Sequence, residues 1–310
     1  IKSENLLITN GSMQVLGLMG QVLINPGDVV ITESPTYFRA VTIFRNCGAE
    51  IVDSPIDENG LNINLLCHQL EKFRSNGKCP KIIYTIPSYQ NPSGITMSLE
   101  RRKQLLAASS EYGFLILEDT AYNDLWYDSP PSPSLYELDN GNGKVVQMGT
   151  FSKIIAPGLS IGWTIGPASL ITRMVEFKDN GGTTPFTASI VAEIIKNDKL
   201  DLHINSLRAV YKAKRNTMIA ALETYMIDLV RWVKPGGGYF IWLEPKETIS
   251  FENLWQNAIN QKVLFLPGKY CYANGCPSDQ GLMRLAFSGL NANDIVEGIK
   301  RLSIAFRESI

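Results

Sequence analysis

Short apolar runs and longer amphipathic segments alternate over the first two-thirds of the chain. The short runs predict strands at Val29–Thr32, Glu50–Asp53, Lys81–Thr85, Phe114–Glu118, Val145–Met148 and Gly162–Ile165. Apolar residues at helical spacing predict helices at about Met13–Ile24, Tyr37–Asn46, Ile63–Asn76, Ser98–Tyr112 and Leu170–Asn180. Alternation of this kind is typical of an α/β fold, in which helices flank a mostly parallel sheet.

The last third of the chain has a different pattern. A long helical stretch at about Leu202–Met226 precedes strand-like runs at Leu229–Val233, Tyr239–Leu243 and Met283–Phe287. The chain closes with an amphipathic helix, in which apolar residues recur at helical spacing after a cap at Asn291 or Asn293. We therefore expect a large domain over residues 1–205 and a smaller α+β domain over residues 206–310.

The composition argues against several classes of protein. With 45% hydrophobic residues and a formal net charge of -1, the chain has no general attraction for nucleic acid or anionic membranes. No apolar run is long enough to span a bilayer. The five cysteines are scattered and odd in number, and the two histidines cannot build a typical His-rich metal site. We expect no metal and reduced thiols, hence an intracellular, cytoplasmic protein, with an organelle as the alternative.

Polar side chains follow three of the predicted strands, at or just beyond their carboxyl ends. They are Asn91, Asp119 and Lys153. In open α/β sheets, ligands bind beyond the carboxyl ends of the strands. A lysine, a carboxylate and an amide with a nearby phenol, here Tyr122, are what a pyridoxal phosphate enzyme needs. The lysine holds the aldehyde as a Schiff base, the carboxylate keeps the ring nitrogen protonated, and the polar pair binds the ring oxygen.

Each of these residues also has an ordinary explanation. Asn91 can belong to an Asn-Pro turn, Asp119 to a helix cap or a salt bridge, and Lys153 to the solvated surface. The apolar neighbours of Lys153 favour chemistry, because an amine among apolar side chains has a lowered pKa and a usable lone pair. The order of the three residues and their shared position at strand ends favour a common site.

The start of the first helix offers a place for a phosphate. Gly11 allows a close approach to the free N–H groups there, and Ser12 adds a hydroxyl. Thr150 and Ser152, close to Lys153, add two further hydroxyls. The alternative for Ser12 is a plain N-cap.

Tyr37 and Arg284 are two further candidates. Tyr37 follows a strand-to-helix turn, where its ring can lie flat on a pyridine ring or pack into the core. Strand alternation puts Arg284 on a face with small residues, opposite Met283, Leu285 and Phe287. That placement suits a bidentate clamp on a carboxylate, and the alternative is an ordinary edge-strand arginine.

Five segments together identify a family. They are Pro87-x-x-Gln90-Asn91-Pro92-Ser93-Gly94, Glu118-Asp119-x-x-Tyr122, Gly149-Thr150-Phe151-Ser152-Lys153-Ile154-Ile155-Ala156-Pro157-Gly158-Leu159, Pro235-Gly236-Gly237-Gly238-Tyr239-Phe240 and Arg284-Leu285-Ala286-Phe287. They resemble the class I/II aminotransferases of pyridoxal phosphate fold type I over essentially the whole chain. The segment around Lys153 is closest to the 2-aminoadipate/kynurenine aminotransferase subgroup, which also resembles the catalytic half of MocR-type regulators.

The resemblance implies a fold and a role for each candidate. The fold would be a mostly parallel, seven-stranded sheet flanked by helices, with a smaller C-terminal domain, in a homodimer. Lys153 would hold pyridoxal phosphate and shuttle the proton, and Asp119 would pair with the ring nitrogen. The other cofactor contacts would be Tyr37 on the ring face, Asn91 and Tyr122 at the ring oxygen, and Gly11, Ser12, Met13, Thr150 and Ser152 at the phosphate. The substrate α-carboxylate would bind Arg284, next to Asn91.

The implied activity is transfer of an amino group from an L-amino acid of the aminoadipate or aromatic type to a 2-oxo acid. Two alternatives stay open. One is another pyridoxal phosphate reaction at the α-carbon, such as β-elimination, and the other is the sensor domain of a MocR-type transcriptional regulator. The chain departs from the family at Ser160, where relatives usually have an arginine that pairs with the phosphate. The family also has a substantial N-terminal portion ahead of Gly11, so we expect a processed or partial product.

Overall fold

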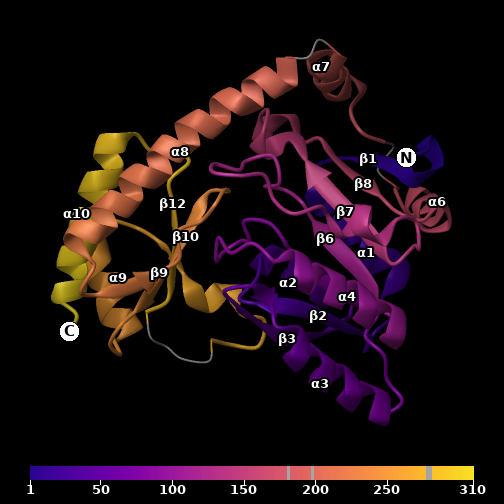
Figure 1. Cartoon of the computed structure of the whole chain (residues 1–310), viewed down its shortest axis with the longest axis horizontal. Coiled ribbons are helices and arrows are strands. Elements are labelled where there is room, and N and C mark those ends of the chain that lie inside the picture. Colours follow the sequence, from indigo (N-terminus) through magenta and orange to yellow (C-terminus); the bar gives the residue numbers. More distant parts are fainter. Residues whose placement is uncertain (180–181, 197–198, 277–280) are drawn as a thin grey trace.

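The computed structural model describes residues 1–179, 182–196, 199–276 and 281–310. The described chain contains two sheets, one of eight strands and one of four. The long helix α8 (Lys199–Tyr225) runs along the outside from α7 to the smaller sheet, where it packs against the last helix (Figure 1). The predicted domain boundary between residues 205 and 206 falls within α8, and it stays a prediction.

The larger sheet has the strand order β1-β8-β7-β6-β5-β2-β3-β4. Its strands are β1 Leu6–Thr9, β2 Val29–Ser34, β3 Glu50–Asp57, β4 Gly60–Leu61, β5 Ile82–Thr85, β6 Leu115–Asp119, β7 Val145–Thr150 and β8 Gly162–Ile165. The five strands β3, β2, β5, β6 and β7 run parallel, and β8 is antiparallel to both β7 and β1. The predicted fold is therefore confirmed, and the strand beyond the expected seven is the two-residue β4, which forms a hairpin with β3.

Helices cover both faces of the larger sheet. They are α1 Ser12–Leu23, α2 Phe38–Asn46, α3 Ile63–Ser75, α4 Leu99–Tyr112, α5 Leu135–Asp139 and α6 Ala168–Glu176, whereas the next helix, α7 Pro185–Lys196, packs against α8. Consecutive residues of β2 pack on opposite faces of the sheet. Val30 lies in the core formed with α1, α2 and α6, whereas Ile31 lies in the core formed with α3, α4 and α5. Burial on both faces explains why these strands read as continuous apolar runs. The predicted helix Leu170–Asn180 corresponds to α6, and its last residue, Asn180, lies outside the described residues.

The smaller sheet has the order β11-β12-β10-β9. Its elements are β9 Val230–Trp232, β10 Phe240–Pro245, α9 Phe251–Asn260, β11 Leu266–Pro267, β12 Met283–Ala286 and α10 Ala292–Arg307. Met283 and Leu285 lie in the core between this sheet and α8, α9 and α10, so strand alternation turns Arg284 to the other face as predicted. Asn291, rather than Asn293, caps α10 by accepting a hydrogen bond from the Asp294 N–H at 2.9 Å.

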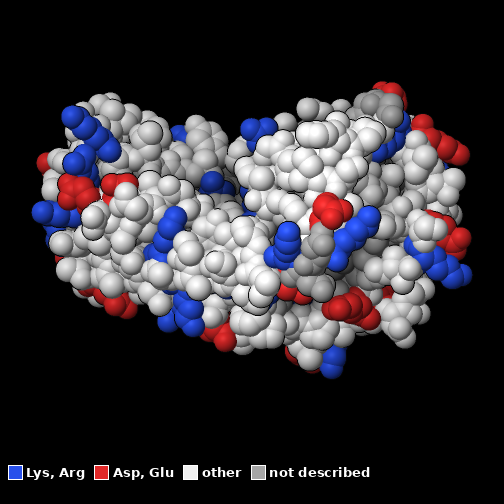
Figure 2. All heavy atoms as spheres, turned by 90° about the horizontal axis from the view of Figure 1, so that it is seen from above, with Lys and Arg blue, Asp and Glu red and all other residues white. Residues whose placement is uncertain are grey.

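Charges of both signs are scattered over the face of the molecule in Figure 2. That view gives no continuous basic surface of the kind that binds nucleic acid. Among the described residues, no helix is long and apolar enough to cross a membrane. Within the same residues, no group of His, Cys, Asp and Glu side chains could hold a metal ion.

Candidate active site

All eleven residues predicted from the sequence line one cavity of about 450 Å³. The cavity lies between the carboxyl ends of the larger sheet's strands and the strands β10 and β12 of the smaller sheet. The predicted residues are Gly11, Ser12, Met13, Tyr37, Asn91, Asp119, Tyr122, Thr150, Ser152, Lys153 and Arg284. Further lining residues include Asn10, Phe38, Ile86, Pro157, Ser160 and Phe240. Segments that are distant in the sequence therefore meet at a single place.

Lys153 is held at the end of a single 3-10 turn that follows β7. Thr150 caps this turn by accepting a hydrogen bond from the Ser152 N–H at 3.1 Å. On the other side, the Tyr239 hydroxyl donates to the Lys153 carbonyl at 2.7 Å. The Nζ atom lies 6.0 Å from the ring centroid of Tyr122 and 5.9 Å from that of Tyr239. Burial lowers the pKa of Lys153, and nearby Arg284 acts in the same direction while Asp119 opposes it, so the neutral nucleophilic amine is easier to reach.

Asp119 is the last residue of β6 and is only 5% exposed. The Tyr84 hydroxyl donates to its Oδ2 atom at 2.8 Å, and the Ala121 N–H donates to Oδ1 at 3.1 Å. Burial raises the pKa of Asp119, and these two hydrogen bonds counter that effect. A buried carboxylate that faces a cavity is stabilised by a cationic N–H from a ligand, as a protonated pyridine ring provides.

The opposite end of the cavity is built from neutral donors. Gly11 has a φ of 72°, and α1 begins at the next residue, so the first N–H groups of this helix are available to an anion. Thr150 and Ser152 add hydroxyls 3.0 Å apart. Gly162 is essential to this arrangement, because a Cβ atom there would lie 2.5 Å from the Gly11 carbonyl carbon and 2.7 Å from the Ser12 nitrogen. The set fits a phosphate group.

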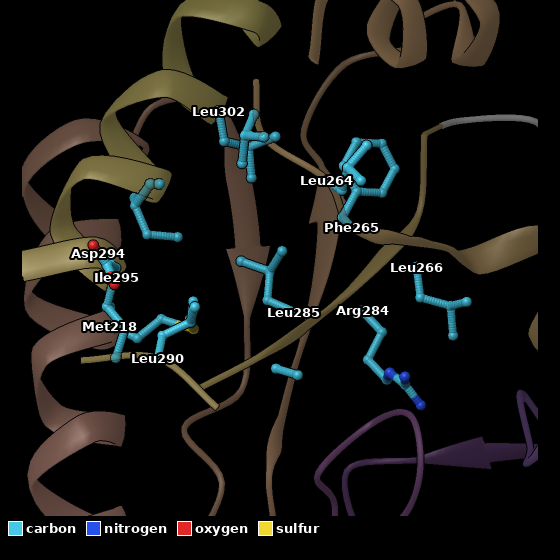
Figure 3. A pocket seen from close by; sticks show the side chains of 14 residues that line it. Met218, Leu264, Phe265, Leu266, Arg284, Leu285, Leu290, Asp294, Ile295 and Leu302 are labelled. Atoms are coloured by element: carbon cyan, nitrogen blue, oxygen red, sulfur yellow. The ribbon is translucent and has the colours of Figure 1, made fainter. Parts of the chain in front are cut away.

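Arg284 reaches the cavity from β12. Its Nη1 atom donates to Asn91 Oδ1 at 2.7 Å, and its guanidinium carbon lies 4.0 Å from the ring centroid of Phe240. Its buried Nε atom has no hydrogen-bond partner among the described residues. Figure 3 shows the guanidinium turned toward the larger domain, away from the apolar side chains of a separate hollow between β12 and α10. A charged donor that lacks a partner suits a carboxylate ligand.

The two remaining predicted aromatic residues lie on different walls. Tyr37 precedes α2, and its hydroxyl donates to the Met13 sulfur at 3.5 Å. The Tyr122 ring packs edge-on against Tyr239 and Phe240, at centroid distances of 5.5 Å and 5.6 Å. Burial raises the pKa of Tyr122, so its hydroxyl keeps its proton and can donate to a ligand oxygen.

Three contributors to the site were not predicted from the sequence: Tyr84, Phe240 and Gly162. The only sequence signal for Tyr84 is a phenol within the otherwise apolar run Ile82-Ile83-Tyr84. Phe240 directly follows the Gly236–Tyr239 part of a family segment, but nothing in the sequence pairs it with Arg284. The role of Gly162 depends on the pairing of Gly162 with Thr150 across β7 and β8, which only the folded sheet reveals.

The chain belongs to the aminotransferase class I and II family, whose model matches residues 1–302. It is a pyridoxal phosphate-dependent aminotransferase, and the lysine, carboxylate, hydroxyl and helix-start donors of the cavity fit that cofactor.

Individual relatives are similar over nearly the whole chain. The aromatic-amino-acid aminotransferase 1 of Thermococcus litoralis is 38% identical over 100% of this chain and 74% of its own length. The 2-aminoadipate transaminase of Thermus thermophilus is 32% identical over 99% of this chain and 76% of its own. The crystal structure of Pyrococcus horikoshii kynurenine aminotransferase, in complex with PMP, has a TM-score of 0.94 and 38% identity, covering 99% of this chain and 76% of that one.

Transcriptional regulators also match this chain. One of them, the helix-turn-helix-type regulator YisV of Bacillus subtilis, is 30% identical over 97% of this chain. The match covers 60% of the regulator's own length. Similarity to this chain is thus shared by enzymes and regulators, with the higher identities among the enzymes.

Ser160 lines the phosphate end of the cavity in a left-handed backbone conformation, with a φ of 49°. Among the described residues, the cationic side chains that line the cavity are Lys153 and Arg284, so an arginine at position 160 would add a third. We predict that Ser160→Arg slows loss of the cofactor, because one charged hydrogen bond contributes about 1.5–3 kcal/mol. The measurement is cofactor release during dialysis. Ser160→Gln, which lengthens the side chain without a charge, is the control, and equal release from a folded Ser160→Arg protein would contradict the prediction.

Proposed function

We propose that this aminotransferase takes its amino group from an L-amino acid of the aminoadipate or aromatic type and passes it to a 2-oxo acid. The observation that carries the proposal is the joint placement of Lys153, Asp119 and Arg284 in one cavity. The names of the relatives in Thermococcus, Thermus and Pyrococcus support the substrate class.

The roles proposed for the side chains follow from their chemistry. When bound, pyridoxal phosphate supplies an aldehyde that takes up an amino group and a ring that accepts the electron pair of the α-carbon. Lys153 would hold the cofactor through its aldehyde carbon, and its amine would move the proton at the α-carbon of the substrate. Asp119 keeps the ring nitrogen protonated, and Asn91 and Tyr122 donate to the ring oxygen. Gly11, Ser12, Met13, Thr150 and Ser152 bind the phosphate, and Tyr37 covers the ring face.

Substrate binding is assigned to the smaller sheet. The unpartnered Nε atom of Arg284 points to an α-carboxylate ligand, because a carboxylate accepts hydrogen bonds from a guanidinium. The Phe240 ring beneath the guanidinium holds its plane, which favours a bidentate contact. Because Lys153 lies in the same cavity, a carboxylate on Arg284 brings the neighbouring α-amino group to the reacting end.

The second candidate function is ligand sensing in a transcriptional regulator, which the match to YisV favours. A regulator needs ligand binding without turnover, whereas an aminotransferase converts donor to product. Net transfer of the amino group to a 2-oxo acid, measured on the longest native protein, decides between these two functions. Formation of pyruvate and ammonia from a β-substituted donor would instead indicate β-elimination.

Assembly, location and domain division are proposed on separate grounds. We infer a homodimer, because large apolar side chains are exposed on consecutive helices: Phe177 is 42% exposed, Phe186 74% and Leu202 73%. Free thiols at Cys47, Cys67, Cys79 and Cys271 support a cytoplasmic location. The division near residue 205 is supported by the separate cores of the two sheets.

Lys153 is predicted to be the residue that holds the cofactor. Borohydride reduction of the purified protein should fix the cofactor covalently to the peptide that contains Lys153, because reduction makes a reversible carbon–nitrogen double bond permanent. Peptide mass spectrometry is the measurement, with Lys153→Arg as the unlabelled control. Labelling of another lysine would overturn the assignment.

Asp119→Asn is predicted to keep the cofactor and lose most of its turnover. The shape is retained, but the charge that stabilises a protonated ring nitrogen is gone, so kcat should fall by roughly 10²-fold or more. Asp139→Asn is the matched control, since Asp139 is also a buried carboxylate, 4% exposed, but accepts from the Lys144 N–H outside the cavity. Near wild-type turnover of Asp119→Asn would refute the role.

Arg284→Lys is predicted to weaken amino-donor binding and spare cofactor binding. Lysine keeps the charge but loses the planar fork, so the apparent KM should rise about tenfold or more. Arg231→Lys, on strand β9 of the same sheet and outside the cavity, is the control. An unchanged KM in Arg284→Lys would show that the carboxylate binds elsewhere.

A further inference from the structure

Glu33 is a buried carboxylate that the proposed mechanism does not use. It lies near the carboxyl end of β2 and is 2% exposed. The Thr85 hydroxyl donates to Oε1, while the Ile86 N–H and the Gln90 side-chain amide donate to Oε2, both at 3.1 Å. None of the salt bridges among the described residues includes Glu33. Its charge is therefore met by hydrogen-bond donors alone.

Gln90 is the centre of the loop that follows β5. Its amide nitrogen donates to Glu33 and also to the Pro35 carbonyl at 2.7 Å. Its amide oxygen accepts from both the N–H and the hydroxyl of Ser93, at 2.8 Å and 2.7 Å. Both hydrogens and both lone pairs of the side-chain amide are thus engaged. The Gln90 backbone closes the same loop, because its carbonyl accepts from the Gly94 N–H at 2.7 Å.

The next residue in this loop is Asn91, which lines the cavity. Its side-chain oxygen accepts a hydrogen bond from Arg284 at 2.7 Å, and its side-chain nitrogen is left to donate to a ligand. The position of Asn91 depends on the loop, and the loop is fixed to β2 through Gln90 and Glu33. Hydrogen bonds at Gln90 and at Asn91, joined by the peptide bond between these two residues, therefore connect the buried end of β2 with the guanidinium of Arg284.

We propose that Glu33 and Gln90 form a positioning pair that sets the geometry of Asn91 and Arg284 for the substrate α-carboxylate. The inference rests on the proposed roles of Asn91 and Arg284. Neither member of the pair lines the cavity, so each acts through the loop and not on the substrate.

The pair needs a carboxylate at position 33. All three hydrogen-bond partners of Glu33 are placed to donate to it, and a carboxylate accepts without donating. A glutamine at position 33 would remove the charge that strengthens the bond from Gln90, and it could keep the three contacts in only one of its two amide orientations, with its nitrogen donating to the Thr85 hydroxyl. The loop would then shift or loosen.

The test uses three variants of the holoenzyme: Glu33→Gln, Gln90→Met and the double variant. The apparent KM and kcat are measured with L-phenylalanine and L-2-aminoadipate as donors, alongside the cofactor dissociation constant. Glu33→Gln should raise KM about tenfold, with a smaller change in kcat, because misplacing a binding group by about 1 Å can cost up to ~10²-fold. If Glu33 acts through Gln90, the double variant should match Gln90→Met alone.

Asp139→Asn is the control for general stability. Asp139 is 4% exposed and accepts from the Lys144 N–H at 3.1 Å. Neither residue lines the cavity or belongs to the loop that follows β5. Asp139→Asn should lower resistance to urea while leaving KM unchanged, which separates positioning from general stability.

Crystal structures of Glu33→Gln and Gln90→Met supply a readout without turnover. Lengthening of the 2.7 Å bond between Arg284 and Asn91 supports the proposal. An unchanged KM in both single variants, additive effects in the double variant, or an intact Arg284–Asn91 bond would overturn it. If the wild type does not transaminate, the proposed function is refuted, but the crystal structures still test whether Glu33 and Gln90 position Asn91 and Arg284. If Glu33→Gln does not fold, Gln90→Met alone tests the proposal by the same measures.

Discussion

Burial of carboxylates at the carboxyl ends of β2 and β6 is the constraint on which the site depends. Glu33, Glu118 and Asp119 are all nearly inaccessible to solvent, and an ionised group in such a place is costly unless donors surround it. Glu33 and Glu118 each receive three hydrogen bonds from the chain. Asp119 receives two and faces the cavity. The same physical requirement therefore makes two of these groups structural and leaves the third for a ligand.

The cationic side of the cavity follows the same logic. Arg284 is stabilised by the face of Phe240 and the oxygen of Asn91, while its Nε atom stays without a partner in the described chain. Burial lowers the pKa of Lys153, and the positive charge of Arg284 acts in the same direction, against the opposing effect of Asp119. The residue that fits a carboxylate thus also helps to keep the lysine nucleophilic. The charge of Arg284 therefore affects both the binding of a carboxylate and the reactivity of Lys153.

Features that depend on local pattern could be predicted, and features that depend on register could not. The central strands were found because burial on both faces makes them continuous apolar runs, whereas β1 has a mostly exposed pattern and β4 and β11 have two residues each. The candidate residues were found because strand ends and family segments are visible in the sequence. The contact of Tyr84 with Asp119 joins residues 35 positions apart, and that of Glu33 with Gln90 joins residues 57 apart. Such pairings exist only once the sheet has formed.

The phosphate end shows how backbone geometry compensates for a missing charge. The family resemblance implies an arginine at position 160, and this chain has a serine there, so the donors at this end of the cavity are N–H groups and hydroxyls. Neutral donors attract an anion only at short range, which makes their placement critical. The close approach of α1 to β8 provides that placement, and it requires a glycine at position 162, where any Cβ atom would clash with Gly11 and Ser12. On the roles proposed for Lys153 and Asp119, a larger share of cofactor retention would then fall on the opposite end of the cavity.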